Sequence, residues 1–150
     1  MNLKICLAKK VLIFYSVIAP FIMYGSLHNV IHGLIVKDAP SYRIGPFSIF
    51  GFLIMPFLLV ITYLRNSCII TPDSLTIFKT VYKFSDYDIY IGQKELPFKE
   101  RPLTSLFKKT YDELLIKERS TNEVVEVKDL DVFEKDIVNI KNAISANKRS

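Results

Sequence analysis

The feature that most restricts how this chain can fold is an uncharged stretch of sequence, Gly45–Leu64. As an α-helix with a rise of ~1.5 Å per residue it would be about 30 Å long, the thickness of a bilayer's hydrocarbon core. Lipid offers no partner to an unpaired backbone amide, so a helix is the conformation that this stretch can adopt in a membrane. We therefore predict a membrane-spanning helix over about residues 45–64.

A second apolar run comes earlier in the chain and extends from Val11 to Val36, after a short basic arm. Signal peptides also combine a basic start with an apolar run, but this run is longer than a signal-peptide core and lacks a small-x-small cleavage site. We predict a first spanning helix over about residues 11–35. Because only the short polar stretch Lys37–Ile44 joins the two runs, they should form an antiparallel hairpin within residues 1–66.

The flanking cations predict the orientation of this hairpin, because cytoplasmic loops are enriched in lysine and arginine. The connecting loop carries Lys37 and Arg43, whereas the other side carries Lys4, Lys9, Lys10 and Arg65. We predict an integral protein of the cytoplasmic membrane that crosses it twice, with both termini in the cytoplasm.

Charge and cysteine content exclude some classes of protein. Most of the net charge of +5 lies in the first 43 residues, where it reflects membrane topology. No lysine- and arginine-rich run with interleaved aromatic residues is present, which argues against a nucleic-acid partner. Cys6 and Cys68 do not form the disulfide framework that small exported domains need, and both are predicted to be free thiols.

Residues 67–150 are predicted to form one small domain of short strands separated by turns. The predicted strands are Ser67–Thr71, Leu75–Lys79, Val81–Tyr90, Leu96–Phe98, Glu113–Arg119 and Glu123–Lys128. Their spacing of about eight to twelve residues is typical of a small antiparallel barrel or sandwich.

The chain is predicted to end in an amphipathic helix. Asp131 and Glu134 have the spacing of a capping box, which predicts that Asp131 is the N-cap of the helix. The apolar stripe that should close the barrel consists of Phe133, Ile137, Ile140 and Ile144. The predicted fold class is therefore a membrane α-helical hairpin followed by a small α+β domain.

Two local patterns resemble a known family. Cys68–Ile77 resembles the opening strand, turn and second strand of bacterial pleckstrin-homology-like (PH-like) membrane proteins, and Tyr82–Ile89 is similar to their third strand. The resemblance implies a bent antiparallel sheet that one C-terminal helix plugs, preceded by two membrane helices. The loop Pro72–Ser74 has no cation, whereas phosphoinositide-binding relatives place basic residues there.

A basic stretch between the predicted strands is the first candidate for a binding site. Its cations are Lys94, Lys99, Arg101, Lys108 and Lys109. Leu103 and Phe107 lie among them and could enter the membrane interface beside anionic headgroups. The alternative is that Leu103 and Phe107 fill the barrel while the lysines face water.

His28, Asn29 and His32 form a second candidate at the far end of the first helix. The histidines are four residues apart and share a helix face, a spacing that zinc ligands use. The chain has no third histidine to complete a metal or haem site. Intramembrane contact with a partner protein, or no specific contact at all, are the other interpretations.

These patterns predict a non-enzymatic, membrane-anchored PH-like module that binds a protein partner or anionic headgroups at the cytoplasmic face. An immunity-type inhibitor of a membrane-acting toxin, or a minor subunit or assembly factor of a membrane complex, are the alternatives. The sequence contains no catalytic triad, phosphate loop or metal cluster, so we expect no enzymatic activity and no cofactor. The expected partners are the lipid bilayer and an unidentified protein, and no signal for an oligomeric state is present.

Overall fold

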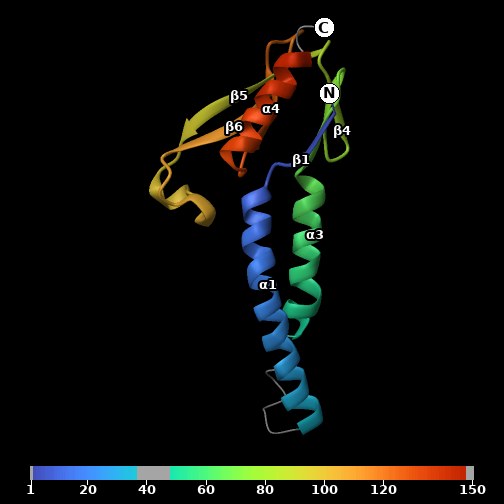
Figure 1. The fold of residues 1–150 in the computed structure, drawn as a ribbon, viewed down its shortest axis with the longest axis vertical. Helices are drawn as coiled ribbons and strands as arrows, with labels where there is room; N and C mark the ends of the chain where they lie inside the picture. The colour runs from blue at the N-terminus through green and yellow to red at the C-terminus, as the bar shows by residue number, and fades with distance from the viewer. Residues whose placement is uncertain (1, 37–47, 148–150) are drawn as a thin grey trace. The chain divides into compact units, whose positions relative to one another are not determined.

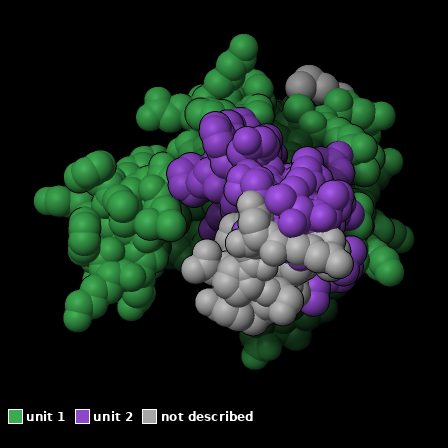
Figure 2. Space-filling model, turned by 90° about the horizontal axis from the view of Figure 1, so that it is seen from below, with its two compact units in different colours: residues 1–11, 64–150 green, residues 12–63 purple. Residues whose placement is uncertain are grey.

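The computed structural model describes residues 2–36 and 48–147. The chain divides into two compact units, residues 1–11 with 64–150 and residues 12–63 (Figure 2). Figure 1 traces the elements in chain order. They are β1 (Leu3–Cys6), α1 (Lys9–Val30), the π-helical turns η1 (Ile31–Val36) and η3 (Phe50–Ile54), α3 (Met55–Arg65), β2 (Ser67–Ile70), β3 (Ser74–Ile77), β4 (Thr80–Lys83), β5 (Tyr87–Glu95), the 3₁₀ turns η4 (Phe98–Glu100) and η5 (Leu103–Ser105), β6 (Thr110–Glu118), β7 (Val124–Asp129) and α4 (Glu134–Asn147).

Residues 12–63 are helical wherever they are described. The helical stretch Lys9–Gly33 is long and apolar enough to cross a membrane, as predicted for the first apolar run. A second apolar helix, Phe50–Arg65, is shorter. The predicted connection Lys37–Ile44 and the first residues of the predicted second span lie outside the described residues.

The two apolar helices come into close contact where two small residues, Gly51 and Ser26, meet. A Cβ atom added to Gly51 would lie 1.8 Å from Oγ of Ser26, so only glycine fits at this position. Ser26 is fully buried, and its hydroxyl donates to the carbonyl of Ile22 at 2.9 Å. Small residues with satisfied hydroxyls are what closely packed membrane helices require.

The strands form two antiparallel sheets, with strand orders β1-β2-β3-β4 and β5-β6-β7. The sequence predicted a small antiparallel barrel or sandwich. The barrel is wrong, because within the described residues no strand pairing joins the two sheets. The predicted strand Val81–Tyr90 is in fact interrupted between β4 and β5. The backbone N–H of Phe84 donates to the carbonyl of Asp73. The N–H of Asp86 donates to the carbonyl of Lys83, and this bond closes a turn between the two strands.

Strand β1 was not predicted, because the sequence there reads only as a basic arm. It pairs with β2, with Leu3 opposite Ile70 and Cys6 opposite Ser67. Leu7, which follows β1, is completely buried in the core. Because Ile5 and not Cys6 lies opposite Cys68, the two thiols face opposite sides of the sheet. Both cysteines are free thiols, as predicted.

A single hydrophobic core lies between the two sheets and α4. It contains Leu7, Cys68, Ile70, Leu75, Ile77, Tyr82, Phe84, Ile89, Leu114, Ile116, Leu130, Val132, Ile137, Ile140, Ala143 and Ile144. The predicted stripe on the last helix is thus correct for its three isoleucines. It is wrong for Phe133, which is 46% exposed and lies under the ammonium groups of Lys9 and Lys10.

Candidate functional site

Asp131, which lies just before α4, forms hydrogen bonds with residues near the start of the chain. Its backbone N–H donates to the carbonyl of Leu7, and its own carbonyl accepts the N–H of Lys10, both at 2.9 Å. Its carboxylate accepts the N–H of Val11 at 3.0 Å. The first turn of α1 contains no acidic residue, so Asp131 supplies the negative charge that a helix N-terminus favours.

This role for Asp131 replaces the predicted capping box. Helix α4 begins at Glu134, two residues later than an N-cap at Asp131 predicts. The carbonyl of Phe133 accepts the N–H groups of Asp136 and Ile137 at 2.9 and 3.1 Å, respectively. Sequence spacing could not reveal this, because the group that Asp131 caps lies 120 residues away.

The same carboxylate also holds the segment 98–107, which contains the two 3₁₀ turns. The hydroxyl of Thr104 donates to the Asp131 carboxylate, with both oxygens at 3.1 Å. Arg101 stabilises the conformation of this segment, because its guanidinium donates to the carbonyls of Leu96 and Leu106 at 3.0 and 3.3 Å. One carboxylate thus joins the segment 98–107 to the first turn of α1.

The segment 98–107 presents large apolar side chains to the outside. Phe98 is 63% exposed, Leu103 69% and Phe107 96%. The alternative that Leu103 and Phe107 fill the core is therefore wrong. The predicted strand Leu96–Phe98 is also wrong, because Phe98 begins a 3₁₀ turn in which Arg101 lies over its ring at 5.7 Å. Exposed aromatic and aliphatic side chains on a short turn are typical of surfaces that contact a membrane or a partner.

The predicted cations fall into two groups. Lys94 is ion-paired with Asp129 at 2.5 Å and Glu113 at 3.6 Å, and the hydrogen bond to Asp129 raises the pKa of Lys94. Lys108 lies 3.6 Å from Asp112. Lys99 and Lys109 make no ion pair with any residue that the structure describes, so their charges are available to an anionic surface.

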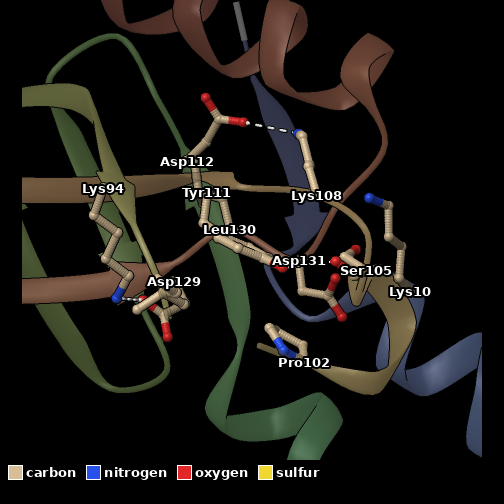
Figure 3. Close-up of a pocket in the computed structure, with 11 residues that line it drawn as sticks. Lys10, Lys94, Pro102, Ser105, Lys108, Tyr111, Asp112, Asp129, Leu130 and Asp131 are labelled. Atoms are coloured by element: carbon tan, nitrogen blue, oxygen red, sulfur yellow. Dashed lines mark hydrogen bonds and ion pairs between the residues drawn. The ribbon is translucent and has the colours of Figure 1, made fainter. Parts of the chain in front are cut away.

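Lys94 and Lys108 meet Lys10 around a small pocket of about 30 Å³, which Figure 3 shows in close-up. Such a volume accommodates a water molecule or two and excludes a headgroup. Asp112 lines it and is almost fully buried, and it accepts from Gln93 at 3.1 Å. Pro102 and Ser105 of the segment 98–107 line this pocket. The candidate site is the exposed surface of the same segment.

Sequence reasoning missed Lys10, Thr104, Asp112 and Asp131. A signal was present for Asp112, because it precedes Leu114 and Ile116 in period-two alternation and so belongs to the buried face of β6. No comparable local signal exists for Lys10, Thr104 or Asp131, whose contacts join distant parts of the chain.

His28, Asn29 and His32 lie together near the end of α1. The rings of His28 and His32 stack with their centroids 4.1 Å apart. Within the described residues, no group of three or more His, Cys, Asp or Glu side chains could hold a metal ion.

No protein-family model, curated protein or solved structure matches this chain.

Proposed function

We propose that this protein is a two-pass membrane protein whose PH-like domain, residues 1–11 and 64–150, contacts anionic lipid headgroups through the segment 98–107 and the adjacent lysines. The observation that carries this proposal is the bridge from Thr104 through Asp131 to Val11. Because Val11 lies at the start of the candidate span, the bridge holds exposed Phe98, Leu103 and Phe107 where the chain would enter the bilayer.

The pairing of β1 with β2 supports two crossings. Strand β1 precedes both apolar helices and β2 follows them, yet the two are hydrogen-bonded neighbours. They must therefore lie on the same side of a membrane, which requires an even number of crossings between them. Zero crossings would leave Phe21, Tyr24 and Phe57 exposed to water. Two crossings place them in lipid.

The same strand argues against a cleaved signal sequence. Cleavage after the apolar run would remove β1 from the sheet and Leu7 from the core, where it is completely buried. A retained N-terminus is consistent with the hydrogen bonds between residues 7–11 and Asp131. The cytoplasmic orientation rests on the flanking cations, to which Lys4, Lys9, Lys10 and Arg65 contribute.

The strand arrangement is consistent with the resemblance to PH-like domains. A four-stranded and a three-stranded antiparallel sheet are followed by a C-terminal helix that packs on the core. The loop Pro72–Ser74 supplies no cation, so we place headgroup contact at the segment 98–107 instead. Fold alone does not define a ligand. The exposed apolar side chains favour a lipid surface over an enclosed ligand, as do Lys99 and Lys109, which make no ion pair with a described residue.

A tryptophan reporter in the full chain tests this proposal, because the sequence contains no tryptophan. Phe107→Trp should leave the core intact, since Phe107 is almost fully exposed. In nanodiscs with anionic lipid, its emission should shift to the blue and be quenched by spin-labelled headgroups. Lys99→Glu with Lys109→Glu should weaken this contact by more than tenfold, because each cation near an anionic surface contributes about 1 kcal/mol.

Two matched controls keep the test specific. Lys83→Glu with Lys141→Glu changes the net charge equally, uses exposed lysines of β4 and α4, and should have no effect. Thr121→Trp places the reporter at the far end of the β6–β7 hairpin and should remain unquenched. Equal Phe107→Trp emission in neutral and anionic nanodiscs, unchanged by high salt, would refute headgroup binding and favour a protein partner.

A further inference from the structure

An apolar cavity of about 300 Å³ lies between the two apolar helices of residues 12–63. Leu12 and Tyr15 of α1 line one side of it. Phe50, Met55, Leu58 and Leu59 line the other. None of its lining residues is charged, and Tyr15, Phe50 and Leu58 are exposed at its edge. The cavity is therefore apolar and open to its surroundings, so whatever surrounds these helices can enter it.

The dimensions of the cavity restrict what can occupy it. Its lining residues extend from Phe50 to Thr62, a distance of ~18 Å along a helix. This is close to the ~15 Å depth of one leaflet's hydrocarbon. Apolar cavities of about half this volume already bind small hydrocarbons such as benzene. A partner helix, at ~10 Å across, is too wide for such a volume.

We propose that this cavity binds one acyl chain of a phospholipid. The inference rests on the two-pass arrangement proposed above, because that arrangement surrounds the cavity with lipid. An unfilled cavity of this size would deprive its lining of dispersion contacts, and an acyl chain restores them. The tight contact at Gly51 and Ser26 keeps the helices together while the cavity stays open beside it.

Native mass spectrometry of the full chain, extracted from membranes of neutral phosphatidylcholine, tests this proposal. The wild type should retain one phospholipid per chain. Leu59→Trp places a larger side chain in the cavity and should lower the lipid-bound fraction at least tenfold. Val60→Trp is the matched control, because Val60 is the next residue of α3, is exposed and does not line the cavity. It should retain the lipid.

Further variants separate this site from the headgroup contact. Leu59→Ala enlarges the cavity and should keep the lipid, which shows that loss in Leu59→Trp comes from filling and not from misfolding. Lys99→Glu with Lys109→Glu should also keep it, even though that pair is expected to weaken headgroup contact by more than tenfold. A wild type that carries no lipid, or only detergent, would overturn the proposal, as would a Leu59→Trp variant that still carries one.

A reporter at Tyr15 gives an independent measurement. In detergent, Tyr15→Trp should be quenched by about one equivalent of phosphatidylcholine with brominated acyl chains, and the quenching should then saturate. Tyr24→Trp on the same helix is exposed and lies outside the cavity. Its quenching should rise only in proportion to the total brominated lipid. Identical titration curves for the two reporters would overturn the proposal.

Discussion

Asp131 has the most demanding role of any single residue in the described chain. Its backbone and its carboxylate form hydrogen bonds with four residues, Leu7, Lys10, Val11 and Thr104. A carboxylate at a helix N-terminus typically contributes about 1 kcal/mol, and here it also satisfies a hydroxyl of the segment 98–107. The nearby ion pair of Lys9 with Asp136, at 2.9 Å, strengthens the same junction.

Asp131→Ala should lower the free energy of unfolding of the domain by ~1–3 kcal/mol, because it removes a helix cap and leaves two donors unsatisfied. Asp131→Asn retains an acceptor and should cost less. Cys68 is completely buried, so alkylation of its thiol at pH 8 requires opening of the domain. Burial also raises the pKa of this thiol to about 12, which disfavours the reactive thiolate. In a Cys6→Ser background, Asp131→Ala should therefore accelerate alkylation of Cys68. An unchanged rate would show that Asp131 does not stabilise the domain.

At the scale of elements, α4 closes the core with three isoleucines and an alanine. Ile137→Ala should cost ~2–5 kcal/mol, because Ile137 is only 7% exposed. Phe133→Ala is the control from the same helix end and should cost about 1 kcal/mol or less, since its ring makes only exposed contacts with lysines. Limited proteolysis of residues 64–150 in the membrane-inserted protein measures the difference. Equal protease resistance in the two variants would show that α4 is peripheral.

Local sequence patterns predicted most of these elements, but they did not predict how the elements associate. Short strand-forming segments separated by turns identified β2, β3, β6 and β7, and helical periodicity identified the buried isoleucines of α4. The break between β4 and β5 was missed because Phe84 and Tyr87 favour strands. In the structure the turn is closed by the hydrogen bond from Asp86 to Lys83, and Phe84 bonds to the distant Asp73. The basic stretch of the candidate site was predicted from charge. Its attachment through Asp131 was not, because side-chain contacts over 120 residues leave no periodic signal.

At the scale of the whole molecule, the two-pass proposal predicts the location of both ends of the chain. A reporter enzyme fused after Ser150 should be active only in the cytoplasm. A cysteine introduced at Ser41, in a background without Cys6 and Cys68, should react with an impermeant reagent added outside the cell. Protection of that cysteine, together with reporter activity outside the cytoplasm, would reverse the proposed orientation.

The pairing of β1 with β2 also ties the order of synthesis to the completion of the fold. Strand β1 leaves the ribosome before either apolar helix, whereas its partner follows both of them. In the two-pass proposal, insertion of the helical hairpin would bring the two strands together and would remove much of the entropy cost of closing so long a loop. A chain in which one helix failed to insert would have the bilayer between the two strands. Its unpaired β1 and uncovered Leu7 would then distinguish it, for chaperones and proteases, from a correctly inserted copy.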